Sequence, residues 1–342
     1  MIGRRHVAHI AEHPDMELVG VIDPVPLELD VPRFDAIEDV DVAADAIIIA
    51  TPSDLHADHA EAAAARGWHM LIEKPVASDL GSAARIIAAV DRADVRVLVG
   101  HHRRHHARVR KLKAVLDGGT IGRPLIASLI WAVKKPDAYF DVAWRSGRDG
   151  SPVFINLVHE VDTLRYLFGD VAQVSGVGSN AQRGAARVET GAVTLGFDGG
   201  VVATVAFSDA APSPWSFEAG TGENPNIATT GLDMLRVVGT QGGVSFPSLR
   251  VWTGAADWSE APVERREDAA SNVPLVAQLD HFVDVVAGRA DAVVDAREGA
   301  ASLRATLQIE EAVSRFDWAG PVDLACGLGP PARAIPSEEE RQ

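Results

Sequence analysis

One lysine in this sequence stands where it could act directly on an alcohol. Lys74 lies in the tripeptide Glu73-Lys74-Pro75, which follows the apolar run 69–72. The ordinary role of a lysine is that of a solvated surface cation, but the proline restricts the backbone here, so the ammonium group is not free to swing into solvent. A lysine held in this way can bind a substrate hydroxyl and stabilise the alkoxide that develops as its proton leaves.

A histidine further along the chain could take that proton. His159 lies in a helical pattern from Phe154 to Leu167, where Asn156, His159 and Thr163 share one face at spacings of three and four residues. A single histidine on a helix is more often structural than catalytic. Its pairing with Lys74 in a chain of nucleotide-binding architecture favours the catalytic interpretation, and an unperturbed imidazole pKa suits a general base at neutral pH.

The first 125 residues alternate short apolar runs with helical patterns. The runs are hydrophobic on both faces and end at turn residues, which is typical of parallel strands covered by helices on both sides of a sheet. This predicts a doubly wound α/β domain, whose ligands bind at the carboxyl ends of the strands, where Thr51 and Glu73 fall. The expected strands are 18–22, 46–50, 69–72 and 95–99, and the expected helices are 4–13, 55–66 and 80–93.

The pattern changes after Gly122-Arg123-Pro124. Longer alternating segments follow, separated in places by turns such as Asp198-Gly199-Gly200, which predicts an α+β domain with an open, mainly antiparallel sheet. We therefore expect a Rossmann domain over 1–123, a substrate and oligomerisation domain over 124–329, and a flexible tail over 330–342. The expected strands of the second domain are 125–133, 171–178, 192–197, 201–207, 235–238 and 249–252, and its expected helices are 154–167, 275–287 and 297–315.

The first residues match the later half of a dinucleotide-binding unit. Such a unit has a strand, a G-x-G-x-x-G turn, a helix and a second strand that ends in an acid about 20 residues further on. Here Gly3 precedes a helix, and Asp23 follows a buried strand. Asp23 could be an ordinary turn residue, but an acid at this place accepts ribose hydroxyls and repels a 2′-phosphate, so it favours NAD over NADP. We expect the first strand and the first two glycines to lie upstream of Met1, and the chain to begin at an internal start.

The composition excludes several kinds of partner. The chain has 32 basic and 48 acidic residues and a net charge of −16, and a field of this sign repels nucleic acids and anionic lipid. No apolar run approaches the ~18 residues of a membrane span, and the first residues do not form a signal peptide. The single cysteine, Cys326, excludes an internal disulfide framework and a cysteine-based zinc cluster. We expect a cytoplasmic protein without nucleic acid or membrane partners.

A family resemblance follows from the motifs taken together. ATPSDLH, EKP, GHHRRHH and INLVHEVD, in this order and spacing, resemble the Gfo/Idh/MocA oxidoreductases, and LVAQLDHFVDVVAG extends the resemblance over nearly the whole chain. The resemblance implies a Rossmann domain and an open-faced sheet domain that often forms the oligomer interface. It also implies hydride transfer between NAD(P) and a secondary alcohol of a sugar, an inositol-like polyol or a cyclic diol. We therefore expect an NAD-dependent dehydrogenase that forms a homo-oligomer through its C-terminal sheet.

The same resemblance assigns roles to individual residues. His159 would withdraw the hydroxyl proton as hydride leaves for the nicotinamide, with Lys74 and Asn156 as the other catalytic residues, and all three would contact substrate. Trp144 and Arg145 are as readily substrate contacts as loop residues, and the same holds for the segment 214–225. The cofactor contacts that the resemblance implies are Ile2, Gly3, Asp23, Thr51, Pro52, His56, Glu73, Lys74 and Arg103. The Lys74-Pro75 bond is a candidate cis peptide, because X-Pro bonds tolerate that form.

One residue departs from the family pattern. Many relatives have an aspartate four residues before the histidine, where this chain has Ile155. The helper role passes to Asn156, whose amide can orient a hydroxyl but cannot take a proton. The assignment of the base therefore rests on His159 alone.

Two other interpretations stay open at this point. His101, His102, His105 and His106 form pairs four apart that could bind a metal, but the intervening arginines oppose a cation, so no metal site is predicted. Instead of an enzyme, the chain could be a non-catalytic regulator that binds NAD or sugar, or an inactive truncated product. The presence of both Lys74 and His159 favours the enzyme.

Overall fold

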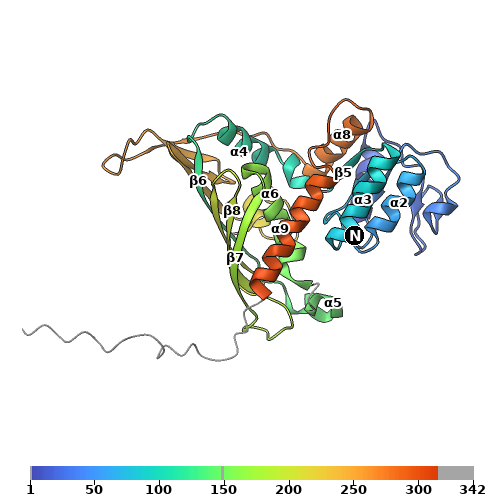
Figure 1. Cartoon of the computed structure of the whole chain (residues 1–342), viewed down its shortest axis with the longest axis horizontal. Helices are drawn as coiled ribbons and strands as arrows, with labels where there is room; N and C mark the ends of the chain where they lie inside the picture. Colours follow the sequence, from blue (N-terminus) through green and yellow to red (C-terminus); the bar gives the residue numbers. More distant parts are fainter. Residues whose placement is uncertain (1, 148–149, 315–342) are drawn as a thin grey trace, which may run out of the picture.

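The computed structural model of the protein describes residues 2–147 and 150–314, and Cys326 and the segment 330–342 lie outside the described residues. The described chain has two parts (Figure 1). A set of short parallel strands with covering helices forms the first part, and a large sheet with helices on one face forms the second. This confirms the predicted combination of a Rossmann fold with an open, mainly antiparallel sheet. None of the helices in the described ranges is both long and apolar enough to cross a membrane.

Short parallel strands form the centre of the first part. Strands β3, β4 and β5 are hydrogen-bonded in that order, whereas β1 and β2 form a separate parallel pair. No strand precedes α1 among the described residues, and β1 is not hydrogen-bonded to β3. The elements are α1 Ile2–Glu12, β1 Val21–Ile22, β2 Arg33–Phe34, η1 Ile37–Asp39, β3 Ala46–Ile49, α2 His56–Ala65, β4 His69–Ile72, α3 Leu80–Ala93, β5 Val97–Val99, η2 His102–His105 and α4 Ala107–Asp117.

Helices bury both faces of these strands. On one face, Ala60 of α2 and Ile86 of α3 pack with Ile72 of β4, and all three side chains are fully buried. On the other face, Leu71 packs with Phe282 of α8 (Pro274–Val286) in a cluster that also includes Ile10 of α1. Burying a large aliphatic or aromatic side chain contributes roughly 1.5–3 kcal/mol. The two clusters together therefore hold the helices against both faces of the strands.

Eight strands form the single open sheet of the second part. Their order is β13-β12-β11-β10-β6-β9-β8-β7, and every neighbouring pair is antiparallel except β6 and β9, which run parallel. The elements are β6 Pro124–Ala132, η3 Asp137–Asp141, α5 Ala143–Ser146, η5 Val153–Leu157, α6 Val158–Phe168, β7 Val171–Ser179, β8 Thr190–Phe197, β9 Val202–Ser208, α7 Phe217–Thr221, β10 Leu235–Gly239, β11 Gly242–Phe246, β12 Arg250–Thr253, β13 Val263–Arg266 and α9 Ala296–Ser314.

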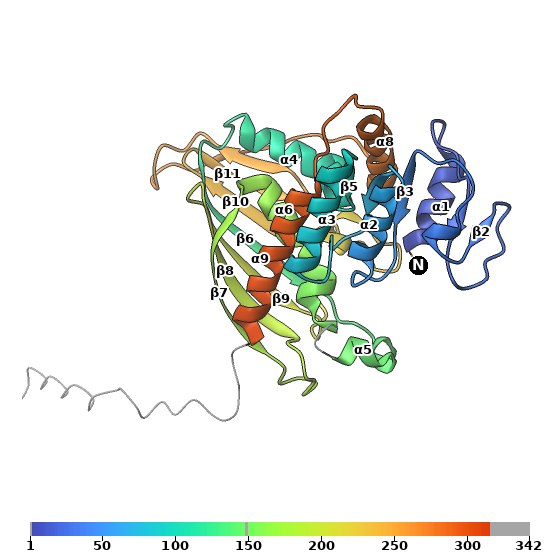
Figure 2. The ribbon, with the colours of Figure 1, turned by 45° about the vertical axis from the view of Figure 1, so that its right-hand side comes forward.

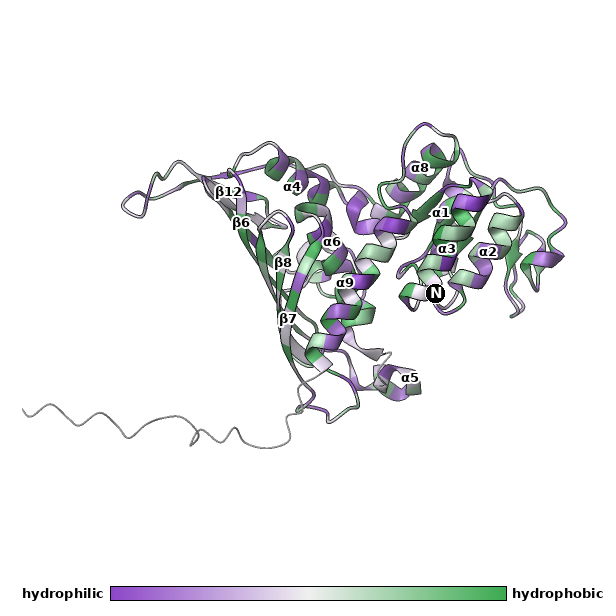
Figure 3. Cartoon of the chain, viewed as in Figure 1, coloured by the Kyte–Doolittle hydropathy of each residue, from purple (hydrophilic) through white to green (hydrophobic). Residues whose placement is uncertain are grey.

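The two faces of this sheet differ because side chains alternate along a strand. On the inner face, Leu129, Val205 and Phe207 are buried, and helices α4, α6 and α9 lie on this side (Figure 2). The hydropathy colouring shows the apolar strands and the mixed surfaces of the helices beside them (Figure 3). On the outer face, Ile126 and Val202 remain exposed. The sheet therefore has one face that no described element covers.

Helix α9 connects the cores of the two parts. Ala300 and Leu303 pack into the core of the first part, and Ile309 and Val313 pack against the sheet. The division at residue 123 stays a prediction, and α8 and the start of α9 return to the first part after the sheet is complete. The periodicity of the sequence did not predict that these C-terminal helices pack on the first part.

Most predicted elements occur within one to three residues of their expected ends, and α3 and β4 occur at the expected residues. The predicted helix 154–167 is instead the π-helical turn η5 followed by α6. Strand β11 begins at Gly242, and a Cβ there would lie 2.0 Å from the carbonyl oxygen of Trp252. Helices α4, α5 and α7 and strands β2, β11 and β13 were not predicted. All of them except α4 have five residues or fewer, whereas α4 buries an apolar face that includes Val109, Leu112 and Leu116.

Candidate functional site

The tripeptide after β4 forms the rigid centre of the candidate site. The Lys74-Pro75 bond is cis, as predicted. Glu73 is buried, and its Oε1 accepts a hydrogen bond from His6 Nε2 at 2.8 Å, while its Oε2 accepts the backbone N–H of Lys74. Burial alone would raise the pKa of Glu73, but the hydrogen bond and charge of His6 hold it below the usual value. Gly100 has no room for a side chain, because a Cβ there would lie 2.9 Å from Glu73 Oε2.

The ammonium group of Lys74 reaches across to the second part of the molecule. Its Nζ donates to the backbone carbonyl of Ile155 in η5 at 3.4 Å. Burial lowers the pKa of Lys74, although the charge of Glu73 opposes this shift. The contact joins the carboxyl end of β4 to the turn that carries Asn156, so the two predicted catalytic segments meet.

Two side chains near this lysine have unused polar atoms. Asn156 Oδ1 and His159 Nδ1 are buried and have no hydrogen-bond partner among the described residues. The ring of His159 packs edge-on against His102, with 5.3 Å between the ring centroids. Thr163, which the helical spacing placed on the same face, donates its hydroxyl to the His159 carbonyl at 2.8 Å. Thr163 therefore supports the helix backbone, whereas Asn156 and His159 keep atoms for a ligand.

The environment of His159 corrects the expectation of an unperturbed pKa. Burial, followed by the charges of Lys74 and Arg103, lowers the pKa of His159 well below 6.5. The imidazole is thus neutral at pH 7 and has the lone pair that a base requires. Its affinity for a proton is low while both cations stand beside it.

A buried arginine holds the helix that carries His159. The guanidinium group of Arg103 donates to Glu160 at 2.6 Å, to Glu218 at 2.8 Å and to Glu223 at 3.1 Å, and it lies 3.9 Å from the ring centre of Phe217. These carboxylates belong to α6, to α7 and to the segment after α7. Contact between Arg103 and a cofactor stays a prediction, and in this structure its three guanidinium nitrogens bind carboxylates.

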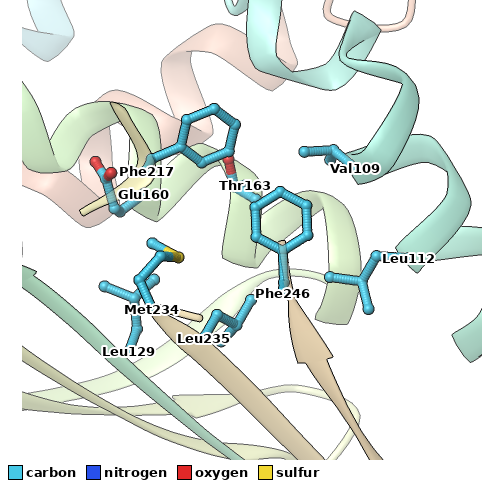
Figure 4. Close-up of a pocket in the computed structure, with 9 residues that line it drawn as sticks. All are labelled: Val109, Leu112, Leu129, Glu160, Thr163, Phe217, Met234, Leu235 and Phe246. Atoms are coloured by element: carbon cyan, nitrogen blue, oxygen red, sulfur yellow. The ribbon is translucent and has the colours of Figure 1, made fainter. Parts of the chain in front are cut away.

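Three carboxylates around one guanidinium leave an excess of negative charge. Burial raises the pKa of Glu160 to about 7, although Arg103 opposes this shift. Oε2 of Glu160 has no hydrogen-bond partner among the described residues, and Figure 4 shows this carboxyl group at the edge of a small cavity beside Phe217 and Met234. A proton can therefore reside on Glu160 near neutral pH, next to the residue proposed as the base.

The four histidines after β5 have separate partners. His101 Nδ1 lies 3.6 Å from Asp162, His102 Nε2 lies 2.8 Å from Glu223, His105 Nδ1 accepts from Arg110, and His106 Nδ1 accepts the backbone N–H of Arg108 at the start of α4. In the described ranges no three His, Cys, Asp or Glu side chains are placed to hold a metal ion. Their positions point to a structural role for three of these rings, while His102 contacts His159 directly.

The turn after β3 contains three predicted cofactor contacts. Thr51 Oγ1 lies 3.1 Å from His59 Nδ1, and Pro52 is exposed. His56 is fully buried, with its ring nitrogens 2.9 Å from the Thr51 carbonyl and 3.1 Å from the Pro75 carbonyl. His56 therefore joins the turn after β3 to the tripeptide after β4, and its contact with a cofactor stays a prediction.

The amino end of α1 lies beside the carboxyl end of β3. A Cβ at Gly3 would lie 3.6 Å from Cβ of Ala50, and Ile2 is the first helical residue. The first N–H groups of a helix have no partner within it and attract anions. Asp23 follows β1 and is half-buried, with Oδ1 accepting the backbone N–H of Val25 at 2.9 Å, and the hydrogen bonds of the described residues leave its Oδ2 unused.

The remaining predicted contacts lie at the other end of the site. Trp144 and Arg145 are both in the short helix α5, where Trp144 is half exposed. The Arg145 guanidinium lies 4.3 Å from the ring centre of Tyr139. The segment 214–225, which could have been loop or substrate contact, supplies Glu218 and Glu223 to Arg103.

Sequence reasoning missed three participants in this site. His6 lies on the buried face of α1, and nothing in its spacing pointed to Glu73, which is 67 positions away. Glu218 and Glu223 lie in a polar segment without periodicity. The one signal was the pair Arg103 and Arg104 directly after a buried strand, because buried arginines need carboxylate partners.

Comparison with protein families gives two matches along the chain. Residues 1–101 match a model described as an oxidoreductase family with an NAD-binding Rossmann fold, and residues 109–245 match the GFO/IDH/MocA C-terminal domain. A 1,5-anhydro-D-fructose reductase of Ensifer adhaerens is 34% identical over 46% of this chain and 49% of its own length. An inositol 2-dehydrogenase of Mycolicibacterium gilvum is 36% identical over 40% of this chain and 37% of its own length. The alignments thus span about half of these relatives or less.

Solved structures resemble the chain over more of its length. The WlbA dehydrogenase of Bordetella pertussis, solved with NADH and UDP-GlcNAcA, is 25% identical, has a TM-score of 0.73, and is matched over 92% of this chain and 94% of its own. The UDP-N-acetylglucosamine 3-dehydrogenase GnnA of Acidithiobacillus ferrooxidans has a TM-score of 0.72 at 22% identity, over 92% of this chain and 95% of its own, and supports the fold alone.

We predict that acid weakens the fold between about pH 6.5 and pH 4, because the unfolded chain protonates histidines that are buried and neutral in the folded protein. The pKa is about 4 for His101 and His106 and about 3 for His105, in each case mainly because of burial, against an ordinary value of 6.5. The unfolded chain therefore binds these protons first, so stability is complete above about pH 6.5 and falls as the pH drops toward 4, by up to roughly 1.4 kcal/mol per pH unit for each histidine. Glu160, whose pKa is raised, binds its proton first in the folded protein, so its contribution to stability rises as the pH falls below 7. This contribution offsets the loss from about one histidine.

Urea unfolding at a series of pH values measures this effect. His105→Gln should lower the slope of the unfolding free energy against pH by up to roughly 1.4 kcal/mol per pH unit, because it removes one buried imidazole that the unfolded chain protonates first. His59→Gln, a half-exposed position, is the matched control and should leave the slope unchanged. A stability that is constant from neutral pH to pH 5 would contradict the prediction.

Proposed function

The chain belongs to the Gfo/Idh/MocA family of oxidoreductases, and on this basis we propose that it is a dehydrogenase of secondary alcohols. Its substrates would be sugars, inositol-like polyols or cyclic diols, with NAD as the cofactor. The observation that carries the proposal is the meeting of Lys74 with η5, since Lys74 Nζ binds the Ile155 carbonyl beside the unused atoms of Asn156 and His159. Relatives named inositol 2-dehydrogenase and 1,5-anhydro-D-fructose reductase support this substrate class.

The residues fit a dinucleotide cofactor. The start of α1 lies against the end of β3 at Gly3, where the absence of a side chain lets a pyrophosphate approach the helix. Asp23 has a free carboxylate oxygen after β1, which suits the hydroxyls of the adenosine ribose. Thr51, Pro52 and His56 shape the turn after β3, and Glu73 and Lys74 would stand by the nicotinamide ribose.

The proposed mechanism separates the hydride from the proton. NAD bound at this site would supply the acceptor for the hydride of the carbinol carbon. Lys74 donates a hydrogen bond to the substrate oxygen and stabilises the negative charge that develops there. The neutral imidazole of His159 takes the hydroxyl proton, and Asn156 orients the hydroxyl through its amide. In the reverse direction, the protonated His159 returns this proton to the carbonyl oxygen.

The outer face of the sheet is the proposed oligomer interface. Val238, Ile126 and Val202 are paired across the adjacent strands β10, β6 and β9 and form one apolar row. They are 49%, 55% and 46% exposed, respectively. Contiguous apolar surface of this kind marks contacts between proteins. We also propose a cytoplasmic location, since the sequence contains one cysteine, which fits a reducing compartment.

The catalytic assignment predicts separate effects of two substitutions. Lys74→Met should lower kcat by about 10²-fold to 10³-fold, because the alkoxide loses its charged donor. His159→Gln should lower kcat by about 10²-fold to 10⁴-fold, which is the usual contribution of a general base. Both can be measured from NADH formation with a panel of inositols, sugars and anhydro sugars.

The control for this pair is Lys111→Met, which removes a surface lysine paired with Glu267. It should leave kcat unchanged. NAD binding by calorimetry without turnover of any compound would favour the sensor interpretation. Full activity in Lys74→Met would reject the proposed site.

The cofactor assignment predicts a change of preference at Asp23. Asp23→Asn keeps an oxygen for the Val25 N–H but removes the charge that repels a 2′-phosphate. NAD affinity should fall about tenfold, as expected for loss of a charged hydrogen-bond acceptor, and NADP affinity should rise. Asp41→Asn, an exposed acid on the same part of the molecule, is the control. An unchanged ratio of the two affinities would show that Asp23 is an ordinary turn residue.

The proposed interface predicts a loss of assembly. Replacing both Ile126 and Val202 with Glu places two charges in the apolar row and should convert the oligomer to a monomer in light scattering. Val25→Glu changes an equally exposed valine in the first part and should preserve the assembly. A wild-type chain that is monomeric at all concentrations would exclude this interface.

A further inference from the structure

A group of basic residues lies at one end of the inner face of the sheet. This basic cluster consists of Lys135 after β6, Arg145 in α5, and Arg183 and Arg187 in the connection between β7 and β8. Lys135 and Arg187 are nearly fully buried, at 8% and 3% exposure. The hydrogen bonds and ion pairs of the described residues do not link the cluster to Arg103 or its carboxylates, and the mechanism above uses none of the four residues.

The acids beside the cluster do not balance its charge. Asp209 lies 2.8 Å from Arg187, 2.7 Å from Arg183 and 3.6 Å from Lys135. Glu189 lies 3.4 Å from Arg183. Four cations thus face two buried carboxylates among the described residues. Burial lowers the pKa of Lys135 to about 8, although Asp209 opposes this shift, as expected for an ammonium group with too little negative charge around it.

Two donors of the cluster have no hydrogen-bond acceptor. Lys135 Nζ and Arg145 Nε are buried and make no hydrogen bond within the described ranges, whereas Arg187 Nη2 is paired with Asp209 Oδ2. Arg187 and Arg145 are joined, because Arg187 Nε donates to the Arg145 carbonyl at 3.1 Å. Buried cationic donors without acceptors are rare, because each loses its hydration without compensation.

Two aromatic rings cover these donors. Lys135 Nζ lies 4.8 Å and the Arg145 guanidinium 4.3 Å from the ring centre of Tyr139. The guanidinium groups of Arg183 and Arg187 lie 4.6 and 5.0 Å from the ring centre of Phe140. Cation–π contacts of this kind hold charge more weakly than a carboxylate does. Both rings belong to the short helix η3, which lies between Lys135 and α5 along the chain.

The cluster adjoins the segment that carries Asn156. A Cβ at Gly150 would lie 2.1 Å from the Arg145 carbonyl oxygen, so α5 and the start of that segment are in direct contact. Five residues after Gly150, the carbonyl of Ile155 accepts the hydrogen bond of Lys74. Figures 1 and 2 both place α5 on the side of the sheet that faces the first part of the molecule.

We propose that Lys135 and Arg145 form a subsite for a carboxylate group of the substrate, so that the enzyme acts on polyhydroxy acids. This inference rests on the proposed function, and it narrows the substrate from polyols in general to sugar acids and related hydroxy acids. A carboxylate would supply the missing negative charge and accept hydrogen bonds from Lys135 Nζ and Arg145 Nε, both of which lie against Tyr139. The hydroxyl to be oxidised would then lie toward Lys74, whose Nζ contacts Ile155 in the segment that begins beside Arg145.

Matched pairs of acids and neutral compounds test the subsite. Calorimetry on the full chain with NADH would compare D-glucuronate with D-glucose, D-gluconate with D-glucitol, and L-tartrate with L-threitol. At least one acid should bind about tenfold or more tightly than its neutral partner, which is the usual effect of hydrogen bonds to a charged group. If every acid binds no better than its partner, the subsite is rejected.

Substitutions locate the preference for acids in the cluster. Lys135→Met should reduce the acid to the affinity of its neutral partner, and Lys135→Arg should restore most of the preference. Lys134→Met changes the exposed neighbouring lysine and should have no effect. If Lys135→Met does not fold, Arg145→Gln in the half-exposed helix α5 tests the same point. A preference that survives loss of both Lys135 and Arg145 overturns the proposal.

Turnover distinguishes this proposal from the proposed function. Selective binding of acids without NADH formation from any compound would support the subsite and reject the dehydrogenase. Turnover of neutral polyols with no preference for acids would support the dehydrogenase and reject the subsite.

Discussion

The guanidinium group of Arg103 is the interaction on which the rest of the site depends. It follows the last strand of the first part and donates to carboxylates from three segments of the second part, Glu160, Glu218 and Glu223. A buried ion of this kind is costly unless every donor has an acceptor, so the three segments must take fixed positions around it. Glu160 is the residue after His159. The same hydrogen bonds that satisfy Arg103 therefore set the distance between the tripeptide after β4 and the helix that carries the base.

This arrangement also determines the protonation states in the site. Arg103 and Lys74 both act on His159 and, with burial, keep its imidazole neutral. A neutral ring can accept a proton, but the two cations make the imidazolium short-lived. Glu160, whose pKa lies near 7, stands one residue away. The negative charge that accumulates around Arg103 can stabilise the imidazolium while the proton is held, so the carboxylates both position His159 and moderate the effect of the cations on it.

Local patterns and long-range contacts account for what the sequence could and could not predict. The strand 69–72 and the tripeptide after it were predictable, because a buried parallel strand is an apolar run and Lys74 follows it directly. The helical spacing of Asn156 and His159 was also visible, but the π-helical turn was not, since it depends on how Pro152 and the following residues pack. The partners of Arg103 and the contact of His6 with Glu73 join residues far apart in the chain. Such contacts follow from the fold, and no periodicity encodes them.

Ile155 holds the lysine through its backbone. Lys74 Nζ binds the backbone carbonyl of Ile155, so its position depends on the path of η5 and not on the side chain at that point. A π-helical turn leaves carbonyl groups that are not fully used within the helix, and one of them is directed at Lys74. A carbonyl accepts a hydrogen bond but cannot exchange a proton, and the amide of Asn156 cannot either. In η5 and the first turn of α6, the groups that can accept a proton are thus the imidazole of His159, which is the proposed base, and the carboxyl group of Glu160 next to it, whose pKa is about 7.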